Sequence, residues 1–161
     1  MLTVAVIARK GGVGKTTLTI HLAVKAAKTG QVVIIDTDPQ ASAAQWADDR
    51  EAKQPAVVTC PAVRLPVSLQ AARQGGADFA FIDTAPAIES SALAAVRAAD
   101  FCLIVSRPGI LDLRSIDINM QIARLAGNRW RWSSTRRLCV TGRRLQRART
   151  PARAAAWRSV L

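Results

Sequence analysis

An apolar run, Leu2–Ala8, leads directly into a glycine- and lysine-rich loop, Lys10–Thr17, and then into a helix-forming segment. Glycines let the backbone approach a bound anion and turn several N–H groups toward it, and the helix start adds its positive dipole end. Strand, glycine loop and helix in this order are typical of chains that wrap the phosphates of a nucleotide. The segment therefore predicts an α/β fold with a polyphosphate site; a glycine-rich turn after an edge strand is the alternative.

The loop also carries side chains suited to nucleotide chemistry. Lys15 is placed to reach the β- and γ-phosphates, and the Thr16 hydroxyl is a suitable Mg²⁺ ligand. The strict pattern of such loops would have glycine at position 9, where this chain has Arg9, and an extra lysine opens the loop. The residues predicted to bind the nucleotide are Lys10, Gly11, Gly12, Val13, Gly14, Lys15, Thr16 and Thr17.

Strand and helix patterns alternate at short intervals along residues 1–126. This alternation favours βαβ units and a doubly wound, mainly parallel sheet with helices on both faces. Continuous apolar runs such as Val32–Ile35 and Phe79–Ile82 are typical of strands that are covered on both faces. The expected strands are 2–8, 31–35, 56–60, 79–82 and 101–105, and the expected helices are 15–28, 42–53, 66–74, 90–98 and 111–125.

The electric charge of the chain is concentrated toward its end. The 161 residues carry a formal net charge of +12 at pH 7. Residues 1–126 hold thirteen lysines and arginines against eleven acidic residues, whereas residues 127–161 hold ten arginines, no acid and three of the four tryptophans. We therefore expect a nucleotide-binding domain over residues 1–126 and a basic, Arg/Trp-rich tail over residues 127–161 that is foreign to the fold.

Apolar runs and cysteine spacing both favour a cytoplasmic protein. No apolar run reaches the length of a membrane span, and no charged leader precedes the first strand. The three cysteines, Cys60, Cys102 and Cys139, are scattered and show no C-x-x-C spacing. Idle or buried thiols are therefore expected, rather than a disulfide framework or a metal site.

Two more of the expected strands end in aspartates. Asp36 and Asp38 follow Val32–Ile35, and Asp83 follows Phe79–Ile82. Loops at the carboxyl ends of parallel strands line the ligand crevice, so these carboxylates are candidates for supporting Mg²⁺ and aligning an attacking water. An ordinary Asp/Pro turn is the alternative at the first pair, and apolar strands often end in aspartate. Because three such loops share one sheet edge, they support one another.

Four segments together resemble the deviant-Walker (ParA/MinD) P-loop ATPases, and most of all the ParA-type partition ATPases. They are Lys10–Thr17, Ile34–Gln40, Phe81–Pro86 and Val105–Asp112. The match covers roughly residues 1–126. It implies a P-loop NTPase-like fold, ATP and Mg²⁺ as ligands, and an ATPase that takes part in plasmid or chromosome segregation.

The resemblance also implies roles for particular residues. Lys10 would reach the phosphates of the partner subunit's ATP in an ATP-dependent homodimer, so Lys10, Lys15 and Asp38 form the expected catalytic set. Asp38 would orient the attacking water. Asp36 and Asp83 would support Mg²⁺, with Thr16 as a direct ligand. The dimer would associate with DNA non-specifically, be nucleoid-associated, and respond to a centromere-binding partner protein.

The tail departs from what the resemblance implies. Family members continue through another strand and further helices, so the fold is expected to be C-terminally incomplete, with apolar surface and a sheet edge left open. Gly127–Thr141 stands where the next strand belongs, yet it shows neither alternation nor an apolar run. Tryptophan has one codon, and Trp-Arg-Trp written with CGN arginine codons gives aliphatic residues and alanine in a shifted frame. We therefore expect translation out of frame from about residue 128.

Other interpretations remain open at this point. The tail could be a genuine nucleic-acid arm, with arginines neutralising phosphates and tryptophans stacking on bases. A MinD-like membrane-positioning ATPase would need bulky apolar residues in a C-terminal helix, and Ala152–Val160 offers mainly alanine. An amide ligase or cobyrinate-type synthase would need a substrate pocket that this short chain has little room to build. The last alternative is an inactive fragment that binds nucleic acid through its tail.

Overall fold

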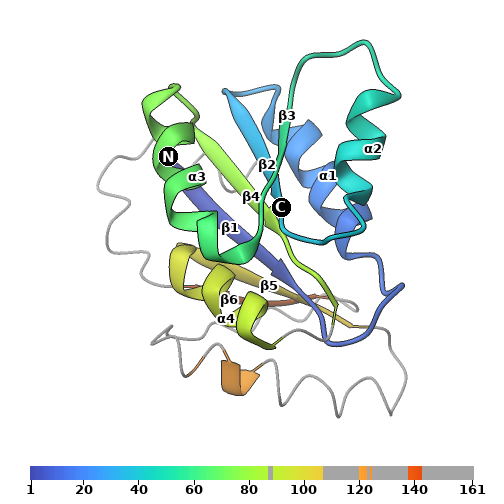
Figure 1. Cartoon of the computed structure of the whole chain (residues 1–161), viewed down its shortest axis with the longest axis vertical. Helices are drawn as coiled ribbons and strands as arrows, with labels where there is room; N and C mark the ends of the chain where they lie inside the picture. The colour runs from blue at the N-terminus through green and yellow to red at the C-terminus, as the bar shows by residue number, and fades with distance from the viewer. Residues whose placement is uncertain (87–88, 107–119, 123, 125–137, 143–161) are drawn as a thin grey trace.

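The strands form one sheet, with loops at a common end that bear the predicted site. The computed structural model describes residues 1–86, 89–106, 120–122, 124 and 138–142. The strands are β1 (Leu2–Ile7), β2 (Val32–Asp36), β3 (Ala56–Thr59), β4 (Phe79–Asp83), β5 (Phe101–Val105) and β6 (Leu138–Gly142). Their order is β3-β2-β4-β1-β5-β6, and the first five are parallel (Figure 1).

Helices cover both faces of this sheet. They are α1 (Lys15–Ala26), α2 (Ser42–Asp48), α3 (Leu65–Gln74) and α4 (Glu89–Ala98), and a short 3₁₀ turn, Ala62–Arg64, precedes α3. In Figure 1, α1 and α2 lie on one side of the sheet, and α3 and α4 lie on the other. The doubly wound α/β fold expected from the sequence is thereby confirmed.

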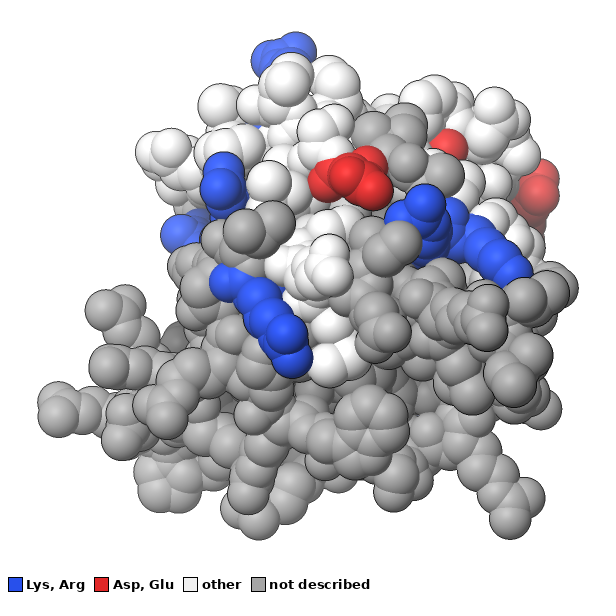
Figure 2. Space-filling model, turned by 90° about the horizontal axis from the view of Figure 1, so that it is seen from below, with Lys and Arg blue, Asp and Glu red and all other residues white. Residues whose placement is uncertain are grey.

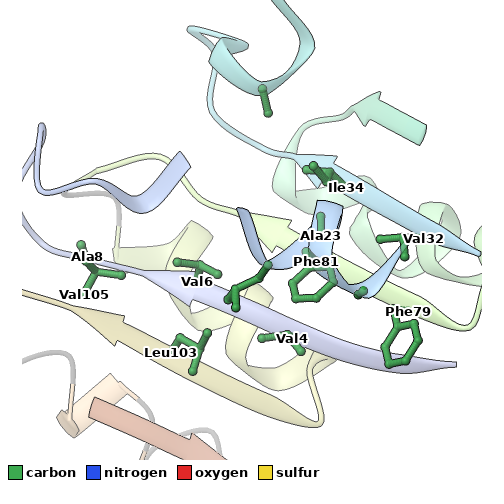
Figure 3. Close-up of a cluster of buried hydrophobic side chains, with 13 residues drawn as sticks. Val4, Val6, Ala8, Ala23, Val32, Ile34, Phe79, Phe81, Leu103 and Val105 are labelled. Atoms are coloured by element: carbon green, nitrogen blue, oxygen red, sulfur yellow. The ribbon is translucent and has the colours of Figure 1, made fainter. Parts of the chain in front are cut away.

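Alternation along the strands divides the core between the two faces. Val4 and Val6 of β1 pack toward α1, in a cluster that includes Phe81, Leu103 and Ile34 (Figure 3). The intervening residue Ala5 belongs to the opposite cluster, with Leu65, Leu69, Ile82 and Ala95. Each fully buried aliphatic or aromatic side chain contributes about 1.5–3 kcal/mol, so both layers anchor the strands that present the site loops.

Helix α2 ends at Asp48, earlier than the expected 42–53, because the residues after Asp48 form other hydrogen bonds. The Arg50 guanidinium stacks on the Trp46 ring, 4.1 Å from its centroid, and donates to the carbonyl oxygens of Gln54 and Pro55. Gln54 in turn accepts the Val32 N–H through its side-chain oxygen at 3.1 Å. These bonds fasten the connection between α2 and β3 to the start of β2, and a longer helix would break them.

Strand β6 is an element that the sequence pattern did not predict. It pairs antiparallel with β5, from Phe101 opposite Gly142 to Val105 opposite Leu138. The expectation that residues 127–161 are foreign to the fold stays a prediction. Most of the expected helix 111–125 lies outside the described residues. The part of it that the structure describes, residues 120–122 and 124, is helical. Among the described residues, no helix is both long and apolar enough to cross a membrane.

Candidate nucleotide-binding site

The loops that follow β1, β2 and β4 meet at one end of the sheet. Asp83, the last residue of β4, lies in register with Val6 of β1 on one side and with Asp36 of β2 on the other. The predicted phosphate loop and both aspartate loops are therefore neighbours. Figure 2 views the molecule from the end that is lowest in Figure 1, and acidic side chains lie there between basic ones.

The phosphate loop has the backbone form that an anion site requires. Gly12 and Gly14 have φ angles of 67° and 95°, which side-chain-bearing residues rarely adopt. Helix α1 begins at Lys15 directly after Gly14, and no side chain caps its N-terminus. Its first N–H groups and the positive dipole end are thus available to a bound phosphate.

The lysines of the loop differ in exposure. Lys15 is 6% exposed at the start of α1, whereas Lys10 is exposed at the opening of the loop. The Lys15 carbonyl oxygen accepts the hydroxyl of buried Thr19 at 3.0 Å, which ties the first turn of α1 together. The Lys15 ammonium lies near Asp83, whose pKa it lowers in part, and its place at a helix start also suits it to an anionic ligand.

Asp83 is the most deeply buried acidic group of the site, with 0% of its surface exposed. Neither carboxylate oxygen has a hydrogen-bond partner of good geometry among the described residues. Burial raises the pKa of Asp83 to about 6, the nearby Thr16 hydroxyl lowers it in part, and the Asp36 charge raises it further. A buried carboxylate without partners beside a hydroxyl fits a divalent cation, which would compensate its charge.

Asp36 has a different environment, although its side chain is also buried. Its Oδ1 accepts the Asp38 N–H and its Oδ2 accepts the Ala43 N–H, each at 3.0 Å. Burial raises the pKa of Asp36, and these backbone hydrogen bonds offset part of that increase. Both oxygens accept a hydrogen bond from the loop between β2 and α2, so Asp36 shapes that loop, and each oxygen keeps a further acceptor site.

Asp38 lies within the loop that Asp36 holds. Its Oδ1 accepts the Gln40 N–H at 3.0 Å, and its backbone carbonyl accepts the Ala41 N–H at 2.9 Å. Ala41 has a positive φ of 50°, which turns the chain into α2. Asp38 is only partly buried, so its second oxygen can reach a water molecule at the rim of the site.

Two threonines at the strand ends were missed by sequence reasoning. The Thr37 hydroxyl and backbone N–H both donate to the Asp83 carbonyl oxygen at 2.9 Å, and the Thr84 hydroxyl donates to the Val6 carbonyl oxygen at 2.9 Å. Each bond joins neighbouring strands directly below the site. Threonine directly after an aspartate in both Asp36-Thr37 and Asp83-Thr84 was the available signal.

The donor set fits Mg²⁺ rather than a transition metal. Among the described residues, no group of three or more His, Cys, Asp or Glu side chains could hold a metal ion by itself. Mg²⁺ commonly keeps several waters and takes few protein ligands beside substrate phosphates. Thr16 and Asp83 at the base of the phosphate loop are therefore a sufficient protein contribution.

Fold and site together define a P-loop nucleotide-binding domain. The profile of the CobQ/CobB/MinD/ParA nucleotide binding domain family matches residues 4–148, and the chain belongs to this family. The resemblance inferred from the four sequence segments is confirmed by this match.

Two curated relatives of the chain carry the same name. Maintenance of carboxysome distribution protein A of Gloeobacter kilaueensis is 44% identical over 114 residues, which cover 68% of this chain and 51% of that protein. The protein of the same name from Halothiobacillus neapolitanus is 32% identical over 114 residues, covering 69% and 53%. The chain thus spans about half the length of the curated relatives it matches.

Solved structures share the fold at lower sequence identity. The ATP complex of Cyanothece McdA(D38A) has a TM-score of 0.66 at 20% identity, covering 79% of this chain and 64% of that one. The structure of pNOB8 ParA bound to nonspecific DNA has a TM-score of 0.56 at 21% identity, covering 74% and 58%. These structures confirm the P-loop NTPase-like α/β class predicted from the sequence.

Proposed function

We propose that this chain binds and hydrolyses MgATP, and that its ATP-bound form dimerises, associates non-specifically with DNA and so positions a cargo in the cell. The observation that carries the proposal is the meeting of an uncapped helix start, a buried lysine and a buried, unpartnered carboxylate at one sheet edge. Lys15 and the Thr16 hydroxyl compensate part of the Asp83 charge, and a magnesium-bound triphosphate would pair with all three features.

The residues have distinct tasks in this proposal. The backbone of Gly11–Thr17 binds the phosphates, and Lys15 neutralises the charge that develops on them as the bond to the γ-phosphorus breaks. Asp38 orients the water that attacks the γ-phosphate. Lys10 reaches the nucleotide of a second subunit, as the family resemblance implies, and its exposed position at the opening of the loop leaves it accessible from outside.

The base of the site is suited to a magnesium ion. Thr16 would supply a direct oxygen ligand, and Asp83 would act from the end of β4, directly or through a bound water. The ion would supply positive charge against the β- and γ-phosphate oxygens. Asp36 supports this arrangement indirectly, since its carboxylate holds the loop that carries Asp38.

The names of the curated relatives add a second candidate for the cargo. The sequence suggested DNA partition with a centromere-binding partner protein, whereas both curated relatives are named for carboxysome distribution. A carboxysome is therefore a second candidate cargo beside a plasmid or chromosome. Both candidates require the same ATP cycle and cytoplasmic DNA association.

Turnover and assembly assays test the proposal directly. We expect slow ATP hydrolysis by the purified chain, dimers in the presence of MgATP on sedimentation, and co-sedimentation with arbitrary duplex DNA. Lys15→Ala should lose all three properties, and Lys53→Ala, an exposed lysine outside the site, should keep them. Absence of MgATP binding by folded wild-type protein, measured by calorimetry, would refute the proposal.

Two of the alternatives have their own signatures in the same assays. Sedimentation with anionic lipid vesicles in MgATP, in place of DNA, would favour the MinD-like membrane-positioning ATPase. DNA binding that is equal in the wild type and Lys15→Ala, with no turnover in either, would indicate an inactive chain that binds nucleic acid through its tail.

A further inference from the structure

An ion pair joins the phosphate loop to helix α4. Nη1 of Arg9, the residue before Lys10, lies 3.7 Å from Oε1 of Glu89, the first residue of α4. The two side chains are 44% and 70% exposed. Glu89 also lies in the first turn of α4, where a negative charge is favourable beside the positive dipole end.

A second contact joins the same two segments. A Cβ atom on Gly11 would lie 4.0 Å from the ring of Pro86, so the phosphate loop passes close to the segment that leaves β4. Because β1 and β4 are adjacent strands, the loops after them form two walls of one site. Arg9 and Glu89 bridge these walls on the solvent side, and Asp83 lies buried at their base.

An exposed pair of this kind contributes little to the stability of the fold, because water and salt screen it and both side chains lose freedom. The core beneath is complete without it, since Val6 and Ile82 are fully buried on opposite faces. A small energy still matters for a loop, because a glycine-rich segment has many alternative conformations. We therefore expect the ion pair between Arg9 and Glu89 to affect ligand binding rather than the stability of the fold.

We propose that Arg9 and Glu89 form an ionic clasp that holds the phosphate loop against the start of α4, in the conformation that receives the nucleotide phosphates. Both are positioning residues, and neither needs to touch the nucleotide. The arginine that this chain has at position 9, in place of the glycine of the strict loop pattern, thereby has a role: it forms the ion pair with Glu89. The inference rests on the proposed nucleotide binding and deepens it.

A double-mutant cycle tests the clasp. Arg9→Gln, Glu89→Gln and the double variant are compared with the wild type in calorimetric titrations with MgATP, at low and high salt. We expect each single variant to raise the Kd about two- to fivefold, the range open to an exposed pair, and the double variant to be no worse than either single. High salt should remove the difference between the wild type and all three.

The sign of the Glu89→Gln effect separates the clasp from a general effect of charge. If only the electrostatic field acted on the phosphates, removing a negative charge would tighten binding while Arg9→Gln weakened it. Three results would each overturn the inference: effects of opposite sign on the Kd in the two single variants, a double variant whose increase in Kd equals the two single effects combined, or single variants with the Kd of the wild type.

Controls separate the possible failures. Arg97→Gln neutralises an exposed arginine in the last turn of α4 and should leave the Kd unchanged. Without ligand, Arg9→Gln should melt at the wild-type temperature, and Glu89→Gln should melt only slightly lower, because it loses a charge that is favourable at the start of α4. A raised Kd together with an equally large fall in melting temperature in both single variants would indicate a structural role instead. Wild-type protein that is folded but binds no MgATP refutes the proposed function, whereas binding without the cycle just described refutes the clasp alone.

Discussion

Asp83 shows how burial makes the charged form of a single side chain of the site unfavourable. Its carboxylate is fully buried and unpartnered among the described residues, and its pKa is raised to about 6, mainly by burial. A carboxyl whose pKa is higher in the folded state than its ordinary value of 3.8 binds its proton more tightly when folded. Its contribution to stability is therefore present at low pH and is lost as the pH rises through about 6.

We predict that Asp83→Asn stabilises the ligand-free protein at pH 8, because the buried charge is removed. The gain should approach roughly 3 kcal/mol in free energy of unfolding at pH 8 and shrink toward pH 4.5. Thermal or urea unfolding in EDTA across this pH range measures it. Glu51→Gln, an exposed acid outside the site, serves as control and should show no such trend. Equal stability of Asp83→Asn and wild type at pH 8 would contradict this account.

At the scale of elements, the loop between β2 and α2 depends on Asp36. The sequence resemblance implied that Asp36 and Asp83 both support Mg²⁺, whereas the structure gives the two carboxylates different surroundings. Asp36 accepts two backbone N–H groups across the loop that carries Asp38. Replacing one of these oxygens by an amide leaves a buried N–H group without an acceptor, at a cost of about 1–3 kcal/mol.

We therefore predict that Asp36→Asn lowers kcat by roughly tenfold to a hundredfold, because Asp38 is displaced from the attacking water. The Mg²⁺ concentration needed for half-maximal nucleotide binding should stay close to the wild-type value, whereas Asp83→Asn should raise it. Steady-state turnover and Mg²⁺ titrations of nucleotide binding distinguish the two variants. A raised Mg²⁺ requirement in Asp36→Asn would restore its interpretation as a magnesium-supporting group.

Elements with strong local signals could be predicted from the sequence, and those set by tertiary contacts could not. The glycine loop and the aspartates that follow the apolar strands predict where the site lies. In a parallel sheet the carboxyl ends of the strands meet at one edge, so these loops must lie together. The segment after α2 is fixed by the Gln54 side chain, which accepts the Val32 N–H from β2, a contact across 22 residues that no local pattern reveals. Ala41 is equally unpredictable, since alanine does not indicate a positive φ. The ion pair of Arg9 with Glu89 depends on two loops far apart in sequence.

At the scale of the whole molecule, the chain combines two kinds of sequence. The described residues up to 106 form a regular, nearly charge-balanced domain, while residues 127–161 carry ten arginines and no acid. A soluble domain surface normally intersperses both signs of charge, so a segment with ten arginines and three tryptophans needs a separate explanation. A nucleic-acid arm and translation from a shifted frame are the two that its composition allows.

We predict that the coding DNA contains a shift of reading frame near residue 127. If Arg129 and Arg131 use CGN codons, the message for Arg129–Trp132 read from each third base begins NTG-GCG-NTG. NTG encodes only leucine, valine or methionine, and GCG encodes alanine, so these three shifted codons are all apolar, as a buried strand at this place requires. Sequencing the gene through this region is the measurement. An uninterrupted frame that continues with family-like strands and helices would confirm the shift, and stop codons in both other frames would contradict it.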